Sequence, residues 1–157
     1  MCIRDRSKYH EHVPFVKGIA DMTMNHAGDK GSIRTILGRK CRFDRWEPRS
    51  FGYNKALPLE EAIKEYGGRG MIKRAFTYKA LNKLIQGSSA DQTKKAMVDC
   101  YNEGLCPILT VHDELCFNIE SKEQEDKVVE IMTTCIPDLN VPFEVDTAIV
   151  DNWGQVE

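Results

Sequence analysis

The spacing of apolar residues divides the chain into short helices and short strands. Proline is favoured in the first turn of a helix, so a helix is expected to begin at Pro14. Gly28 and Gly31 offer places for this helix to end. Three apolar residues recur at helical spacing and define its expected apolar face: Phe15, Ile19 and Met22.

Two strand-like runs follow at residues 33–37 and 40–43, with Gly38 and Arg39 between them. A Gly-X pair between two such runs predicts a β-hairpin with a type II′ turn. The hairpin region is strongly basic, and its cationic residues are Arg34, Arg39, Lys40, Arg42 and Arg45.

A long connection is expected after this hairpin. Residues 46–70 are rich in proline and glycine, and only Leu59–Tyr66 within them favours one or two helical turns. Beyond the connection, the pattern of apolar residues predicts a helix over residues 71–85.

The Gly-Ser-Ser run at residues 87–89 is expected to interrupt that helix. Ser88 and Asp91 have the spacing of a capping box, in which one side chain caps the first turn of a helix. This spacing predicts a second helix that ends at Gly104.

The last third of the chain predicts a second hairpin, a helix and a closing strand. Pro107–Val111 is a β-rich apolar run and residues 114–119 alternate in polarity, with His-Asp-Glu at the bend. Ser121 and Gln124 have capping-box spacing. The helix they open has an apolar face of Val128, Ile131, Met132 and Cys135.

A strand over residues 142–150 is expected to complete this region. The fold class is therefore predicted to be α+β, with an antiparallel sheet that has helices packed on one face. A helix and a basic hairpin precede that sheet.

Composition narrows the class of protein. The 157 residues are 41% hydrophobic and 29% charged, which is typical of one soluble globular domain. No apolar run approaches the roughly 20 residues of a membrane-spanning helix, and residues 1–6 do not form a secretory signal. Residues 1–7 fit nothing that follows, so we expect a non-native leader there and a natural start further upstream. A cytoplasmic protein without a membrane partner is expected.

The six cysteines lack the C-x2-C spacing of zinc sites and redox motifs. Reduced thiols inside a cell fit a chain without a signal sequence, and disulfides in a secreted chain are the alternative.

Charge is distributed unevenly along the chain. Residues 1–80 contain 17 Lys and Arg against 9 Asp and Glu, whereas residues 81–157 contain 5 against 15. A basic front half indicates a polyanionic partner such as nucleic acid. The alternative is that the two halves mix on one neutral surface.

His112, Asp113 and Glu114 carry the clearest chemical signal. Adjacent side chains of a strand point to opposite faces, so we expect Asp113 to face a site and Glu114 to lie beside it. Mg²⁺ favours one or two carboxylates together with substrate phosphates. A polar hairpin turn is the alternative. A P-loop ATPase is disfavoured because the chain has no G-x-x-x-x-G-K-[ST] run.

Lys79, Asn82 and Gln86 are spaced one helical turn apart. Amide donors on a helix face suit the purine N3 and pyrimidine O2 acceptors of the DNA minor groove, which every base pair offers. A solvated helix face is the alternative.

Four segments together resemble DNA polymerase family A, the family of bacterial DNA polymerase I and many phage replicases. They are Tyr9-His-Glu-His-Val-Pro-Phe-Val, Ile36-Leu-Gly-Arg-Lys-Cys-Arg-Phe43, Lys79-Ala-Leu-Asn-Lys-Leu-Ile-Gln-Gly-Ser-Ser-Ala-Asp91 and Thr110-Val-His-Asp-Glu-Leu115. The resemblance covers residues 8–153 and corresponds to the C-terminal part of the polymerase. It implies a junction of fingers and palm over residues 8–70 and a palm over residues 71–157.

The resemblance implies a role for each matching acid. Asp113 corresponds to the palm aspartate that binds the catalytic metals, Glu114 to the adjacent acid, and His112 to a histidine near the primer terminus. The implied cofactor is a pair of Mg²⁺ ions. The implied reaction is in-line attack by a primer 3′-hydroxyl on the α-phosphate of a deoxynucleoside triphosphate, with release of pyrophosphate.

The resemblance also implies DNA contacts. Asn82 and Gln86 correspond to residues that touch template and primer near the nascent base pair. Lys79 and the basic hairpin would lie near the duplex backbone, with Arg34, Arg39 and Lys40 as the candidate hairpin contacts. The implied partners are primer–template DNA and deoxynucleoside triphosphates, and no processivity factor is identified.

Three departures from the family pattern matter. Tyr78 stands where bacterial members have arginine, so Lys79 is the candidate replacement. The connection between Arg39 and Asn82 is longer than in bacterial members, which favours a phage-type enzyme. The Asp-Tyr-Ser-type strand and the nucleotide-binding helix of the family have no counterpart here. The chain alone is therefore expected to be inactive, and a non-catalytic DNA-binding remnant is the alternative.

Overall fold

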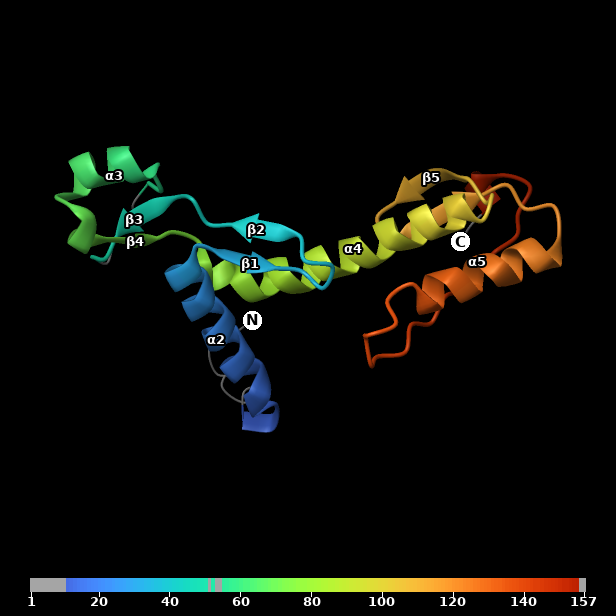
Figure 1. Cartoon of the computed structure of the whole chain (residues 1–157), viewed down its shortest axis with the longest axis horizontal. Coiled ribbons are helices and arrows are strands. Elements are labelled where there is room, and N and C mark those ends of the chain that lie inside the picture. Colours follow the sequence, from blue (N-terminus) through green and yellow to red (C-terminus); the bar gives the residue numbers. More distant parts are fainter. Residues whose placement is uncertain (1–10, 51, 53–54, 156–157) are drawn as a thin grey trace. The chain divides into compact units, whose positions relative to one another are not determined.

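The structure is a computed structural model that describes residues 11–50, 52 and 55–155. The chain forms two compact units, residues 1–88 and 89–157, and helix α4 (Ala80–Asn102) begins in the first and ends in the second. The described residues form three antiparallel sheets of two strands each (Figure 1). The predicted α+β class is confirmed.

Helix α2 (Pro14–Lys30) opens the first unit. It begins at the expected proline and passes through Gly28, and Gly31 ends it with a φ of 71° and an N–H bond to the Ala27 carbonyl (3.0 Å). The expected apolar face is wrong: Phe15 is 65% exposed, and the helix instead buries Thr23 and Ala27. Small residues on that side let the helix approach the rest of the unit closely.

Strands β1 (Ser32–Arg34) and β2 (Lys40–Arg42) form the predicted hairpin. Its turn is not the expected two-residue type. Residues 35–39 connect the strands, and a turn closed by the Gly38 N–H and the Thr35 carbonyl (2.8 Å) lies inside this loop. Gly38 is the last residue of that turn and has a φ of 82°, a conformation that glycine adopts readily.

A second sheet occupies the region expected to hold a connection and the start of a helix. Strand β3 (Trp46–Pro48) pairs with β4 (Ile72–Arg74), and α3 (Leu59–Tyr66), which matches its predicted range, packs against both strands (Figure 1). The short helix η1 (Arg69–Met71) leads into β4. A helix over residues 71–85 is therefore wrong, because β4 gains a partner strand that is distant in sequence.

Phe76 separates strand β4 from the helical region. Its φ of 62° is incompatible with a continuous right-handed helix, so only a short turn, η2 (Thr77–Lys79), precedes α4. Helix α4 is then unbroken, and neither the interruption at residues 87–89 nor the cap at Ser88 is present. Ser88 Oγ donates to the Leu84 carbonyl inside the helix (2.8 Å). The predicted stop is confirmed, since α4 ends two residues before Gly104.

The first unit has a small core at the meeting point of α2, the hairpin and the start of α4. Its buried members are Ala27, Ile33, Phe43 and Ala80, and Cys41 and Leu84 pack against them. Burial of apolar surface at this point joins the hairpin to α4.

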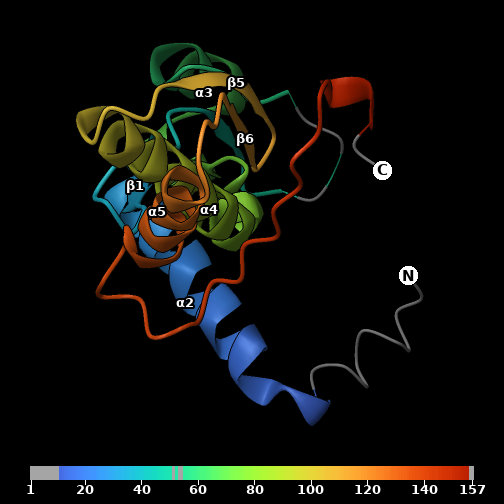
Figure 2. The ribbon, with the colours of Figure 1, turned by 90° about the vertical axis from the view of Figure 1, so that its right-hand side faces the viewer.

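The second unit contains β5 (Pro107–Val111), β6 (Glu114–Phe117) and α5 (Lys122–Thr134). The strands form the predicted hairpin (Figure 2). The predicted cap is confirmed, since Ser121 Oγ accepts the Gln124 N–H (3.4 Å). The Gln124 side chain accepts the Glu120 N–H (2.8 Å) and strengthens the start of α5.

The core of the second unit lies between α4, α5 and the hairpin. The predicted apolar face of α5 is confirmed, because Val128 and Cys135 are buried and Ile131 and Met132 pack with them. From α4, the core receives Ala96 and Cys100.

The closing strand expected over residues 142–150 is wrong. The described residues give it no partner strand, and the segment has no regular secondary structure. Thr147 Oγ1 holds the segment to α5 by donating to the Glu125 carboxylate (2.7 Å). A short helix, η3 (Trp153–Gln155), follows.

The described cysteines are all free thiols, namely Cys41, Cys100, Cys106, Cys116 and Cys135. Burial raises the pKa of the Cys100 and Cys135 thiols, so both stay protonated and unreactive at neutral pH. In the described part of the chain, no helix is both long and apolar enough to cross a membrane.

Candidate nucleic-acid interface and acidic hairpin

The β1–β2 hairpin presents a basic face to solvent. Arg34 and Lys40 are directly opposite in the register, and Arg42 lies on the same face two residues along β2. All three side chains are exposed, whereas Ile33 on the other face is buried. Like charges at opposite positions repel unless an anion lies between them, which makes this face suited to phosphate.

Two of the predicted hairpin contacts are bound within the chain. Arg34 Nη1 donates to the Gly38 carbonyl at 2.8 Å and closes the hairpin loop. Arg39 Nη2 donates to the Gly87 carbonyl at 2.7 Å and thus links the hairpin to α4. Lys40 and Arg42 are the hairpin cations whose exposed side chains fit a phosphate contact best.

The three polar residues predicted to lie one helical turn apart, Lys79, Asn82 and Gln86, are exposed and are called the row below. Asn82 and Gln86 lie one turn apart on the helix, and Lys79 precedes them in η2. The Lys79 ammonium lies 5.4 Å from the Phe76 ring centroid and 5.6 Å from that of Tyr78. Lys79 therefore lies beside Tyr78 and places a positive charge at this end of the row.

Arg74 is a structural residue that the sequence pattern did not reveal. Its Nε donates to the Gly28 carbonyl (3.2 Å) and its Nη1 to the Phe43 carbonyl (3.0 Å). The same guanidinium covers the Trp46 ring at 4.5 Å. It fixes the end of α2 against the hairpin, and only the three-dimensional contacts identify it.

The acidic residues occupy the tip of the β5–β6 hairpin. Val111 pairs with Glu114, so His112 and Asp113 form a two-residue turn, and His112 has a φ of 55°. All three side chains of the His-Asp-Glu run are exposed. Asp113 lies in the turn rather than in a strand, so the strand argument for its direction does not apply to it.

The tip fits part of a magnesium site. Within the described part of the chain, no ion pair or side-chain hydrogen bond holds Asp113 or Glu114, and their carboxylate oxygens are the ligands that Mg²⁺ prefers. No group of three or more His, Cys, Asp or Glu that could hold a metal is found among the described residues. The donor set fits Mg²⁺ when phosphate oxygens or other carboxylates complete the coordination.

The two units carry opposite formal charge. Residues 1–88 contain 18 Lys and Arg against 9 Asp and Glu, and residues 89–157 contain 4 against 15. The basic unit holds the candidate DNA-contacting residues and the acidic unit holds the candidate metal ligands. This separation is expected if one unit binds a polyanion and the other binds cations.

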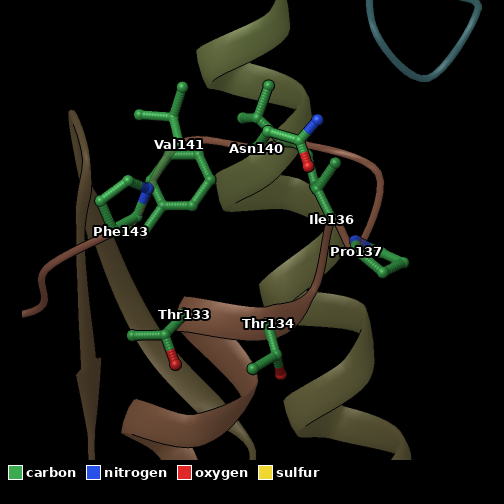
Figure 3. A pocket seen from close by; sticks show the side chains of 9 residues that line it. Thr133, Thr134, Ile136, Pro137, Asn140, Val141 and Phe143 are labelled. Carbon is green, nitrogen blue, oxygen red and sulfur yellow. The ribbon is translucent and has the colours of Figure 1, made fainter.

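A hollow of about 390 Å³ lies after the end of α5 in the second unit (Figure 3). Its lining is mostly apolar, with Ile136, Val141 and Phe143 around it and the Thr133 and Thr134 side chains at one end. No titratable residue lines it, and it includes none of residues 112–114. It does not mark the chemical site.

The family model for DNA polymerase family A matches residues 4–155. The DNA-directed DNA polymerase of Pseudomonas phage M6 is 36% identical over 93% of this chain and 18% of that protein. The thermostable DNA polymerase I of Thermus aquaticus is 29% identical over 93% of this chain and 16% of its own length. A solved structure described as the POL domain of Pol1 from M. smegmatis in complex with DNA primer-template and dNTP is also similar. Its TM-score is 0.61 at 29% identity, and the match covers 88% of this chain and 23% of that one.

The chain belongs to DNA polymerase family A. It spans 18%, 14% and 16% of the length of the relatives from Pseudomonas phage M6, Rhizobium leguminosarum and Thermus aquaticus, respectively. The family resemblance inferred from the four sequence segments is confirmed, with relatives from both phages and bacteria.

Proposed function

We propose that this chain supplies a DNA-contacting surface and a metal-binding acid to template-directed DNA synthesis. The observation that carries the proposal is the exposed row formed by Lys79 at the end of η2 and by Asn82 and Gln86 on α4, the helix to which the basic hairpin is bonded. Family membership supports the reaction class.

In this proposal the row contacts primer–template DNA. Asn82 and Gln86 bond minor-groove acceptors, which tests base-pair shape without reading sequence. Lys79, Lys40 and Arg42 bind phosphates and contribute affinity that falls as salt rises.

Residues 112–114 form the proposed chemical site. Asp113 and Glu114 would hold Mg²⁺, and His112 would contact the primer terminus. An ion held there would supply positive charge to offset the charge that develops on the α-phosphoryl group of a deoxynucleoside triphosphate. The primer 3′-hydroxyl gives up its proton to solvent and its oxygen forms a bond to the α-phosphorus, while the bond from that phosphorus to the oxygen shared with the β-phosphate breaks and pyrophosphate leaves. The protein contributes position and charge rather than a covalent intermediate.

We further propose that the 157-residue chain binds primer–template DNA but does not extend it. Two-metal phosphoryl transfer uses ions about 4 Å apart, held by carboxylates from more than one segment. An Asp-Tyr-Ser run, the expected source of the second aspartate, does not occur in the sequence.

Two measurements test these proposals. The first is the affinity of the chain for a labelled primer–template by fluorescence anisotropy. Asn82→Ala with Gln86→Ala should weaken binding by about tenfold or more, at roughly 1 kcal/mol per lost contact. Asn102→Ala, an exposed amide at the other end of α4, is the matched control. Equal affinity for both variants would contradict the interface.

The second measurement uses a chimera in which this chain replaces the matching segment of the Thermus aquaticus relative. Asp113→Asn in the chimera should slow primer extension at least about a hundredfold while primer–template affinity stays unchanged. An unchanged rate would refute the role of Asp113. Primer extension by the isolated chain above that of its Asp113→Ala variant would refute the proposed inactivity. A chimera that binds primer–template DNA but does not extend the primer would favour a DNA-binding role alone.

A further inference from the structure

Gly87 lies inside α4, one residue after Gln86. Glycine is disfavoured inside a helix relative to alanine, because it loses more backbone freedom on folding. Helix geometry alone does not require glycine at this position. The reason for it lies in the neighbouring hairpin.

A Cβ atom at Gly87 would collide with the hairpin loop. It would lie 2.7 Å from Thr35 Cγ2, with Arg39 Nη2 at 3.7 Å and Cys41 Sγ at 4.0 Å. A Cβ contact under 3.0 Å forces a neighbour to move. Thr35 cannot turn away freely, because it is 5% exposed and its hydroxyl accepts the Arg39 N–H (3.1 Å) and donates to the Arg39 carbonyl (3.3 Å).

Two hydrogen bonds join the same hairpin loop to the same turn of α4. The Ile36 N–H donates to Ser88 Oγ at 3.1 Å, and Arg39 Nη2 donates to the Gly87 carbonyl at 2.7 Å. Ser88 Oγ is itself oriented, because it donates to the Leu84 carbonyl at 2.8 Å. The loop is thereby attached to the helix through one close contact and two directed bonds.

We propose that Gly87 and Thr35 form a steric lock that, with Arg39 and Ser88, seats the β1–β2 loop on the turn of α4 that carries Gln86. These four are positioning residues for the row Lys79, Asn82 and Gln86. Arg39 acts by holding the loop rather than by contacting phosphate. The inference rests on the proposed DNA-binding function.

The proposed lock predicts that a second substitution, at Thr35, reverses the effect of a first substitution at Gly87. Gly87→Ala introduces the methyl group that meets Thr35 Cγ2, and Thr35→Ser removes Cγ2 while keeping the hydroxyl that bonds Arg39. The double variant, Gly87→Ala with Thr35→Ser, should therefore restore the position of the hairpin loop on α4 that Gly87→Ala alone disturbs. Gly18→Ala is the matched control, since Gly18 is an exposed glycine inside α2 and a Cβ atom there would meet nothing within 4 Å.

Two readouts are measured on the full chain. Hydrogen exchange of the Ile36 amide reports the lock directly, because Ser88 Oγ is the group that protects it. Primer–template affinity reports its consequence. Gly87→Ala should speed Ile36 exchange and weaken DNA binding about tenfold, the size expected of an overpacked contact. Thr35→Ser in the same chain should return both values to within about twofold of the starting protein.

The outcomes separate the lock from the DNA-binding proposal. Unchanged Ile36 exchange in Gly87→Ala, or no rescue by Thr35→Ser with helix content retained by circular dichroism, overturns the lock. Faster exchange with unchanged DNA affinity overturns the positioning role. If the starting chain does not bind primer–template DNA, the proposed function and the positioning role both fail. The hydrogen-exchange measurements alone then test whether the lock is present.

Discussion

The guanidinium of Arg74 lies over the indole ring of Trp46, 4.5 Å from the ring centroid. Its Nε and Nη1 atoms reach the carbonyls of Gly28 and Phe43. One side chain therefore joins the end of α2, the hairpin and strand β3. A planar, multivalent donor is required for this arrangement, which lysine does not provide.

Arg74→Ala should lower the free energy of unfolding by about 2–4 kcal/mol, because two charge-assisted hydrogen bonds and a cation–π contact are lost. Arg74→Lys should recover less than half of that loss. Urea denaturation followed by circular dichroism measures both. Lys73→Ala is the control: its 3.5 Å ion pair with Glu47 is half-exposed, and its loss should cost under about 1 kcal/mol. A cost for Arg74→Ala as small as that would show that the guanidinium contacts do not stabilise the unit.

Gly31→Ala should destabilise the chain more than Gly67→Ala. Both glycines end helices with left-handed φ values, 71° and 85° respectively, so both substitutions strain the backbone by about 1 kcal/mol. A Cβ at Gly31 would also lie 2.5 Å from Arg74 Cζ, whereas nothing lies within 4 Å at Gly67. Comparing the urea midpoints of the two variants tests the difference, and equal midpoints would mean that Arg74 moves aside without cost.

Glu125 should make stability depend on pH in the acid range. The Lys122 ammonium and then the Thr147 hydroxyl hold the pKa of Glu125 below its ordinary value of 4.5. A lowered folded-state pKa means that the stabilisation is complete above the ordinary value and is lost as the pH falls through the folded-state pKa. Urea midpoints measured from about pH 6 to about pH 3 should therefore fall less steeply for Glu125→Gln than for the starting chain.

Thr147→Val separates the two causes, because it removes the hydroxyl donor and keeps the Lys122 pair. Its midpoint should show an intermediate pH dependence. Glu123, whose pKa is lowered by the Ser121 hydroxyl, retains a part of the slope in every variant. Identical slopes for Glu125→Gln and the starting chain would contradict the assignment.

Lys40 and Arg42 should each contribute about one unit to the slope of log affinity against log salt concentration for primer–template binding. Their exposed side chains lie on the basic face of the hairpin. Anisotropy titrations of Lys40→Ala and Arg42→Ala across a series of salt concentrations measure this. Lys94→Ala, an exposed lysine of α4 in the acidic unit, should leave the slope unchanged. A similar loss of slope in all three variants would indicate nonspecific attraction rather than a phosphate-binding face.

Signals confined to a few neighbouring residues were readable from the sequence. Pro14 and Gly31 bracket α2, Ser121 and Gln124 start α5, and His112 and Asp113 turn the second hairpin. Each depends on local backbone geometry or a side chain that bonds a residue nearby. The family resemblance and the candidate site residues were likewise available, because motif order and spacing are properties of the sequence.

Contacts between segments distant in sequence determined the parts of the fold that the sequence pattern did not predict. Ile72 lies in a strand because Pro48 pairs with it from far back in the chain, and periodicity within residues 71–85 does not contain that partner. The run at residues 87–89 stays helical because the hairpin loop packs against Gly87 and bonds Ser88, which outweighs the local preference of Gly-Ser-Ser for a break. Arg39, expected at DNA phosphate, is bonded to the Gly87 carbonyl for the same reason. The residue types and their order specified local turns, caps and chemistry, whereas close packing between segments determined which helices continue, which strands pair and which cations bond backbone carbonyls of the chain.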